Sequence, residues 1–266
     1  MKKFYNLCDM SGRTSLITGA SGNLGKILSN TLAELGSELI IVDQLADDLI
    51  LLKDSIEHKW DVPCSIFECD LEEESSRLEL IDYVAKKKNP LNCLVNNAAF
   101  VGTSNLSGWN GELADQTLDT WRRALEVNLT APFHLAQGLH KCLRDSKGAN
   151  IINIGSIYGE IAPDWNLYKG TSMSNPAAYG ASKAGLLQLT RWLSSYFGKS
   201  IRVNAISPGG IFRDQDKKFV EKYIQKTAIG RMAAEDDFIG IVGYLASDLS
   251  QYLTGKVIQL DGGWQR

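Results

Sequence analysis

Short apolar runs alternate with longer amphipathic stretches along the whole of this 266-residue chain. The runs are too short for helices and are apolar at consecutive positions, which is typical of strands buried on both faces. They predict strands over Ser15–Thr18, Glu38–Val42, Ser65–Phe67, Cys93–Val95, Asn150–Ile154, Arg202–Ile206 and Lys256–Leu260. The stretches between the runs predict helices over Leu24–Leu35, Asp47–His58, Glu73–Lys86, Leu118–Leu143, Ala178–Phe197 and Ala234–Ala246.

This order of elements restricts the fold class. Strands that are apolar on both faces need helices above and below them, and a helix between successive strands makes those strands parallel. We therefore predict an α/β fold: a single-domain, doubly wound, Rossmann-like parallel sheet of about seven strands with helices on both faces. Because no Pro-rich, Gly/Ser-rich or repeated segment marks a linker, residues 1–266 are expected to form one domain. Sheets of this kind bind ligands beyond the carboxyl ends of their strands.

Composition narrows the class of partner. The formal net charge is −3 and neither sign forms a long run, which disfavours a nucleic-acid or membrane partner and favours a small-molecule substrate. Five cysteines form no C-x-x-C pair and three histidines lack metal-ligand spacing, so we expect reduced thiols and no metal site. The first residues lack a secretory signal pattern and no run reaches about 18 apolar residues, so we expect a cytoplasmic protein.

A glycine-rich turn joins the first predicted strand to the helix that follows it. The turn reads Thr18-Gly19-Ala20-Ser21-Gly22-Asn23-Leu24-Gly25. Glycines let the backbone turn tightly and approach a pyrophosphate, while free amides at the helix N-terminus attract the negative charge. The turn therefore predicts a dinucleotide site, and a plain strand-to-helix turn is the alternative.

Asp43 lies at the end of the second predicted strand, 24 residues after Gly19. A carboxylate in this place accepts hydrogen bonds from an adenosine ribose and repels a 2′-phosphate. No Arg or Lys lies within the glycine turn or directly after Asp43, although Lys26 lies just past the turn. We therefore expect NAD rather than NADP, and a helix cap or turn acid is the alternative for Asp43.

Tyr179 and Lys183 lie four residues apart in a predicted helix. Residues at this spacing share a helical face, so the ammonium can lie beside the phenol and favour the phenolate. Such a pair can make tyrosine an acid or base, but an ordinary surface pair has the same spacing.

Further motifs follow the other predicted strands in order: Asn96-Asn97-Ala98-Ala99, Asn128, Ser156, Tyr179-x-x-x-Lys183, Ser207-Pro208-Gly209-Gly210 and Thr254-Gly255…Leu260-Asp261-Gly262-Gly263. Together with the glycine turn, they make essentially the whole chain resemble the short-chain dehydrogenase/reductase family, in particular its classical branch. The resemblance implies a single NAD(P)-binding domain and an oxidoreductase activity. It also implies that the two longest predicted helices pair across subunits in a homodimer or homotetramer.

The resemblance gives each motif residue a role. Tyr179 would exchange a proton with the substrate oxygen, while Lys183 would lower the pKa of Tyr179 and hold the nicotinamide ribose. Ser156 would hydrogen-bond the substrate oxygen, and Asn128 would hold a water that links Lys183 to solvent. Taken singly, Ser156 also suits a loop cap, Asn128 a core amide paired with backbone, and Asp70 a helix N-cap. The implied cofactor-binding residues are Gly19, Ser21, Asn23, Leu24, Gly25, Asp43, Asp70, Leu71, Asn97, Ala98, Tyr179, Lys183, Pro208, Gly209 and Ile211.

The chain departs from the family pattern in two places. The middle glycine of the turn is Gly22 rather than the next residue, a spacing similar to that of the extended branch. However, only 83 residues follow Lys183, too few for the C-terminal substrate domain of that branch. Ser156 and Tyr179 are separated by 23 positions, clearly more than is usual in the classical branch. The classical assignment stands because the motifs near the C-terminus lie at classical positions.

Long segments after the strand ends predict substrate loops around residues 100–116, 157–178 and 209–230. Their mixture of aromatic and polar residues is the chemistry of a sugar-binding wall. The alternative is a loop whose aromatic residues pack against its own domain or another subunit. The segment 156–171 is also similar to enzymes associated with flagellin modification and surface-glycan sugars. The candidate substrate residues are Trp109, Trp165, Tyr168, Lys169 and Arg213.

The leading hypothesis is an NAD(H)-dependent oxidoreductase that acts on a secondary alcohol or ketone of a sugar-like substrate. Such a substrate is expected to be polyhydroxylated, and phosphorylated or nucleotide-linked forms fit as well. The first alternative is a reductase of 3-oxoacyl thioesters, which the same four residues would serve but which needs a greasy, open groove. A non-catalytic NAD sensor is the alternative of another class, and the complete set of Asn128, Ser156, Tyr179 and Lys183 argues against it.

Overall fold

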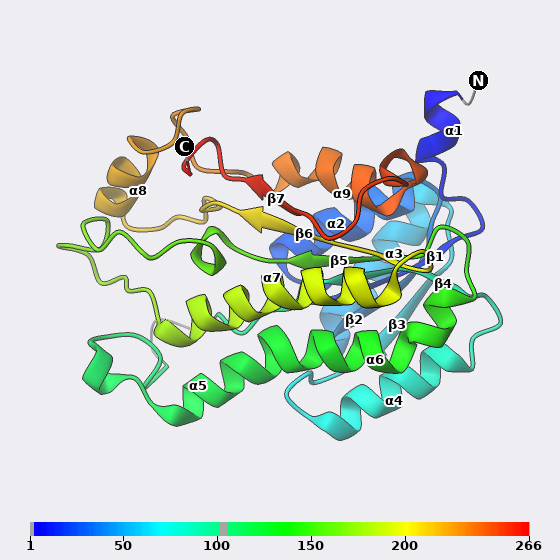
Figure 1. Ribbon diagram of the computed structural model, residues 1–266, viewed down its shortest axis with the longest axis horizontal. Helices are drawn as coiled ribbons and strands as arrows, with labels where there is room; N and C mark the ends of the chain where they lie inside the picture. Colours follow the sequence, from blue (N-terminus) through cyan, green and yellow to red (C-terminus); the bar gives the residue numbers. More distant parts are fainter. Residues whose placement is uncertain (1–2, 102–105, 266) are drawn as a thin grey trace.

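The computed structural model describes residues 3–101 and 106–265. Its centre is a parallel sheet with the strand order β3-β2-β1-β4-β5-β6-β7 (Figure 1). The predicted α/β fold class is confirmed, and each strand lies within a few residues of its predicted bounds. The strands are β1 (Thr14–Thr18), β2 (Glu38–Asp43), β3 (Cys64–Glu68), β4 (Leu91–Asn96), β5 (Asn150–Ile154), β6 (Arg202–Pro208) and β7 (Val257–Leu260).

Helices cover both faces of the sheet (Figure 1). One layer consists of α2 (Asn23–Glu34), α3 (Ala46–Trp60) and α9 (Ile239–Ala246). The other consists of α4 (Glu74–Ala85), α5 (Leu118–Leu125), α6 (Ala131–Arg144) and α7 (Ala177–Phe197). The structure also contains two short helices, α1 (Phe4–Cys8) and α8 (Lys217–Ile224), and 3₁₀ turns at Leu113–Asp115, Ile157–Gly159, Glu235–Phe238 and Asp248–Ser250.

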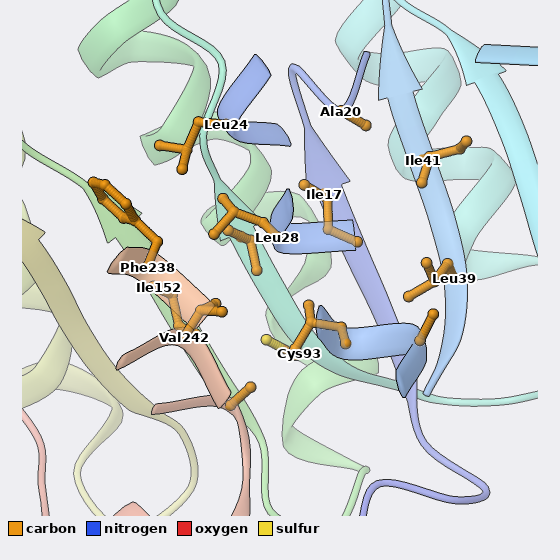
Figure 2. Packing of buried hydrophobic residues seen from close by; sticks show 14 of the residues in the cluster. Ile17, Ala20, Leu24, Leu28, Leu39, Ile41, Cys93, Ile152, Phe238 and Val242 are labelled. Atoms are coloured by element: carbon orange, nitrogen blue, oxygen red, sulfur yellow. The ribbon is translucent and has the colours of Figure 1, made fainter. Parts of the chain in front are cut away.

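Successive residues of each central strand pack alternately into two hydrophobic cores, one on each face of the sheet. Ile17 of β1 lies in the same buried cluster as Leu28 of α2 and Val242 of α9, and Figure 2 labels all three. Its neighbour Leu16 points to the opposite face and joins the cluster that contains Leu139 of α6. Because successive side chains of a strand point to opposite faces, a run that is apolar at every position requires helices on both sides. Full burial of each such side chain contributes about 1.5–3 kcal/mol to folding.

The long helix predicted over Leu118–Leu143 is interrupted. Between α5 and α6 the chain makes a π-helical turn over Glu126–Thr130, which contains Asn128. Pro132 lies in the first turn of α6 and has no amide hydrogen to donate to the Asn128 carbonyl, four residues earlier. The regular α-helical pattern therefore cannot continue through this segment. Along the described chain no helix is long and apolar enough to cross a membrane.

Candidate active site

A cavity of about 700 Å³ opens at the carboxyl ends of the central strands. Gly19 follows β1, Ser156 follows β5 and Gly209 follows β6, and all three line it. The strand order places β1 beside β4. The connection after β1 runs to one face of the sheet and the connection after β4 runs to the other, so a crevice remains between them. The cavity lies where this fold is expected to hold a ligand.

The glycine turn forms one end of the cavity. A Cβ on Gly25 would lie 2.0 Å from the Gly19 carbonyl oxygen, so only glycine lets α2 approach the end of β1 this closely. Gly19 itself has a φ of +63°, which favours glycine. The first amides of α2 have no partner within the helix, and Asn23, Leu24 and Gly25 all line the cavity. These donors and the helix dipole fit the pyrophosphate of a dinucleotide.

Asp43 lines the same end of the cavity, and its carboxylate is firmly held. Its Oδ2 accepts hydrogen bonds from the Ser21 amide at 3.0 Å and the Ser21 hydroxyl at 2.6 Å, and its Oδ1 accepts one from the Gln44 amide at 2.8 Å. The N-cap of α3 is Leu45 rather than Asp43. Ser21, expected to bind cofactor, does not line the cavity and instead orients this carboxylate.

Asp70, Leu71, Asn97 and Ala98, which the family resemblance assigns to the cofactor, also line the cavity. The Asp70 carboxylate accepts a hydrogen bond from the Glu72 amide at 2.9 Å and does not cap α4, whose N-cap is Glu73. The Asn97 side chain donates to the carbonyls of Thr18 and Gly19 at 3.0 and 2.9 Å. Asn97 therefore fixes the glycine turn against the end of β4.

Tyr179 and Lys183 lie on the first turns of α7 and both line the cavity. The Lys183 Nζ is 5.9 Å from the centroid of the Tyr179 ring and donates a hydrogen bond to the Ile154 carbonyl at 2.8 Å. Only 2% of Lys183 is exposed, and this burial lowers its pKa to about 8. The helix brings the phenol and the amine together as their spacing predicts.

The pKa of Tyr179 is set by its surroundings. Burial raises it, while a hydrogen bond from Ser156 and the positive charge of Arg213 lower it. The family resemblance implies that Lys183 lowers the pKa of Tyr179, whereas here burial has the largest effect on it and Ser156 is the strongest of the groups that lower it. The Ser156 hydroxyl also accepts a hydrogen bond from the Tyr158 amide at 3.2 Å, so it caps the 3₁₀ turn after β5 as well.

Asn128 is fully buried and does not line the cavity. Its side-chain oxygen accepts from the Phe100 amide at 2.7 Å, and its Nδ2 donates to the Phe100 carbonyl at 3.1 Å and to the Ser182 hydroxyl at 3.0 Å. This is the core amide paired with backbone that the sequence allowed as the alternative. The proton-relay role of Asn128 stays a prediction.

The candidate substrate residues divide into two groups. Trp109, Tyr168 and Arg213 line the cavity, and Trp109 is 2% exposed with its ring packed edge-on against Phe100. Trp165 and Lys169 are not among the residues that line it, so their contact with substrate stays a prediction. Trp165 is 57% exposed, and its ring centroid lies 6.0 Å from that of Tyr168. Lys169 is exposed and donates to the Asn166 side chain.

Pro208, Gly209 and Ile211, which the family resemblance assigns to the cofactor, line the cavity after β6. Of the three predicted substrate loops, the segments 157–178 and 209–230 are described throughout. Positions 102–105 of the loop 100–116 lie outside the described residues. Within the described chain, no cluster of histidine, cysteine or acidic side chains is arranged to hold a metal ion.

Three further residues of the cavity wall, Tyr158, Asn175 and Tyr223, were missed by sequence reasoning. The hydroxyls of Tyr158 and Tyr168 are 2.7 Å apart, and the Asn175 amide donates to the Tyr168 hydroxyl at 3.2 Å. The Tyr223 hydroxyl accepts a hydrogen bond from the Gly210 amide at 2.5 Å. The position of Tyr158 two residues after Ser156 was the available signal, while Tyr223 lies on α8, which the sequence did not predict.

The sheet order, the anion-binding turn and the tyrosine–lysine pair define a dinucleotide-dependent oxidoreductase. The family model described as enoyl-(acyl carrier protein) reductase matches residues 19–265. The chain belongs to the classical short-chain dehydrogenase/reductase family, and its activity is that of an NAD(P)-dependent oxidoreductase.

Named relatives differ in what they act on. The chain is 28% identical to post-translational flagellin modification protein A of Campylobacter coli, over 96% of this chain and 99% of the relative. It is 32% identical to the 3-oxoacyl-[acyl-carrier-protein] reductase FabG of Rickettsia felis, over 97% and 98%. A solved short-chain dehydrogenase from Leptospira borgpetersenii with bound NAD+ is 28% identical, covers 100% of this chain and 97% of its own, and has a TM-score of 0.83. Other structures of the same fold hold NADP.

Proposed function

We propose that this protein is an NAD(H)-dependent oxidoreductase that transfers hydride between the nicotinamide and a secondary alcohol or ketone of a polar, sugar-like substrate. The observation that carries this proposal is the wall of the cavity around Tyr179. The polar side chains of this wall include Tyr158, Tyr168, Asn175 and Arg213, and the Arg213 guanidinium also pairs with Glu235 at 3.0 Å. Groups of this kind recognise a substrate rich in hydroxyl or acidic oxygens.

The preference for NAD rests on Asp43. Its carboxylate faces the cavity and is held by three hydrogen bonds, so it cannot easily turn away from a ribose. A 2′-phosphate placed beside it would meet a fixed negative charge. Among the described residues, Lys183 and Arg213 are the cations that line the cavity, and Lys183 lies beside the catalytic phenol.

The chemistry follows from the groups around the reacting carbon. A bound nicotinamide supplies or accepts the hydride. Tyr179 gives a proton to the ketone oxygen or takes one from the alcohol, and its raised pKa keeps it protonated at neutral pH. Ser156 hydrogen-bonds the same substrate oxygen, and the positive charge of Arg213 favours the phenolate that forms during reduction. Lys183 would hold the nicotinamide ribose.

A reductase of 3-oxoacyl thioesters is the second candidate. The identity to the FabG reductases supports it, and so do the apolar residues Phe219 and Met232 in the cavity wall. The identity to a flagellin modification protein supports a sugar-like substrate, including a phosphorylated or nucleotide-linked one used in surface glycans. The polar groups nearest Tyr179 favour the sugar over the acyl chain.

We also propose a homodimer or homotetramer. The rings of Trp192 and Tyr196 on α7 stack with centroids 5.1 Å apart, although these side chains are 53% and 71% exposed. Phe133 of α6 is also exposed. Large exposed aromatic side chains on neighbouring helices favour burial against another copy of the chain.

The test is an absorbance assay of reduced nicotinamide with NAD or NADP. The substrates are sugars, sugar phosphates, nucleotide sugars and 3-oxoacyl thioesters, each run beside a Tyr179→Phe variant. Turnover of a sugar with NAD that is lost in the variant supports the proposal. Turnover of the acyl thioester alone transfers the function to the second candidate, and NAD binding without turnover of any substrate contradicts both.

A further inference from the structure

Two phenols in the wall of the cavity share a single hydrogen bond. The hydroxyls of Tyr158 and Tyr168 are 2.7 Å apart, and either can be the donor. The Tyr168 oxygen also accepts a hydrogen bond from the buried Asn175 amide at 3.2 Å. The Tyr168 end of the pair is therefore held by the neutral NH₂ group of Asn175, which donates a hydrogen bond and accepts none from the phenols.

The number of phenol O–H hydrogens determines how many hydrogen bonds this pair can donate to a ligand. Each phenol carries one hydrogen, and the bond between them uses only one of the two. The Asn175 contact uses an acceptor position and no phenol hydrogen. Whichever tyrosine donates to the other, one O–H hydrogen remains for another acceptor. Both side chains line the cavity, so that acceptor can come from a bound substrate.

The backbone fixes this donor close to the reacting centre. The 3₁₀ turn Ile157–Gly159, which carries Tyr158, packs on the start of α7. A Cβ on Gly180, the residue after Tyr179, would lie 3.2 Å from the Tyr158 carbonyl oxygen. A Cβ on Gly159 would lie 2.8 Å from the backbone of Lys183. The backbone of the turn therefore packs closely on the catalytic helix, which places Tyr158 near Tyr179.

We infer that the Tyr158–Tyr168 pair is a specificity determinant that donates one hydrogen bond to a second oxygen of the substrate, close to the carbon that exchanges hydride. This inference rests on the proposed function and narrows its substrate class to alcohols or ketones with a neighbouring oxygen acceptor. Burial raises the pKa of both phenols, so the pair stays neutral and remains a donor through the physiological pH range.

The test compares ligands that differ by one oxygen. Cyclohexane-1,2-diol and cyclohexane-1,3-diol are each titrated against cyclohexanol into the enzyme with bound NADH, and cofactor fluorescence reports the affinity. NADH and an alcohol are both reduced forms and cannot react with each other. The titration therefore measures binding without turnover. The proteins are the parent, a Tyr158→Phe/Tyr168→Phe double variant and a Tyr252→Phe control, whose tyrosine is fully exposed.

The parent is expected to bind at least one diol about fivefold to tenfold more tightly than cyclohexanol, as one neutral hydrogen bond allows. The double variant should reduce this preference to within about twofold while its affinity for cyclohexanol is unchanged. The control should behave as the parent. No preference in the parent, a preference that survives in the double variant, or an equal loss for all three alcohols would each overturn the inference.

The same proteins separate this inference from the proposed function. Oxidation of sugars by NAD tests the function alone. If the diol preference is present and depends on the two phenols but no sugar is oxidised, the proposed function fails and the recognition by the pair stands. If a sugar is oxidised and the double variant keeps the parent's preference, the function stands and the pair has no part in it.

Discussion

Replacing Lys183 by Met is expected to stabilise the fold while it destroys the site. Lys183 is 2% exposed, and in the folded state its pKa is about 8, against an ordinary value of 10.5. At about 1.4 kcal/mol per pKa unit, the ammonium is about 3 kcal/mol less favourable in the fold than in the unfolded chain. Methionine removes this cost, but the Ile154 carbonyl then loses its donor, which costs about 1–2 kcal/mol. The net stabilisation at pH 7 is about 1–2 kcal/mol, or about 2–6 °C in Tm.

The pH dependence gives the sharper check. Below pH 8 the amine is charged in both the folded and the unfolded state, so the full cost is present in the parent. Between the folded value of about 8 and the unfolded value of 10.5 the folded state releases its proton first, and the stability of the parent rises with pH. The advantage of Lys183→Met should therefore be constant below pH 8 and should shrink, and then change sign, as the pH approaches 10.

Urea denaturation of parent and variant without cofactor at pH 7, 8, 9 and 10 measures this difference. Groups other than Lys183 titrate in both proteins and cancel in the comparison. The matched control is Lys199→Met, because Lys199 is exposed and its replacement should change the free energy of unfolding by less than about 0.5 kcal/mol. A variant less stable than the parent at pH 7, or a difference that does not vary above pH 8, would refute the reasoning.

Three further predictions concern the catalytic phenol, the glycine turn and a buried cation. Tyr179→Phe should lower kcat about 10²- to 10⁴-fold while NAD affinity stays within about threefold; a kcat near that of the parent would remove the phenol from the proton step. Gly25→Ala should weaken NAD binding at least about tenfold by titration, because its Cβ would lie 2.0 Å from the Gly19 carbonyl oxygen. Gly240→Ala, where a Cβ meets nothing within 4 Å, is the control and should bind NAD as the parent does. Arg77→Met should lower the free energy of unfolding by about 3 kcal/mol, because Arg77 is 3% exposed, pairs with Glu126 at 2.7 Å and donates to two backbone carbonyls. An equally small effect for Arg77→Met and for the exposed Arg144→Met would contradict this account of the buried pair.

The direction of side chains in the loops could not be predicted from the sequence. Trp109 and Trp165 looked alike in sequence, yet one lies in the cavity wall and the other on the surface. Tyr158 was not predicted as a site residue, yet it forms a hydrogen bond with Tyr168 across the added segment. The direction of a loop side chain depends on the elements that pack against it, and a period of 2 or 3.6 does not extend through irregular backbone.

The sequence by itself determined the sheet, the glycine turn and the tyrosine–lysine pair. These features depend on local periodicity and on spacings of a few residues, which act along a single strand or helix. Only the tertiary structure decided that Ser21 holds Asp43, that Asn128 pairs with the backbone of Phe100, and that burial dominates the pKa of Tyr179. Each of these depends on which groups meet across elements far apart in the chain, and on how much water their packing excludes.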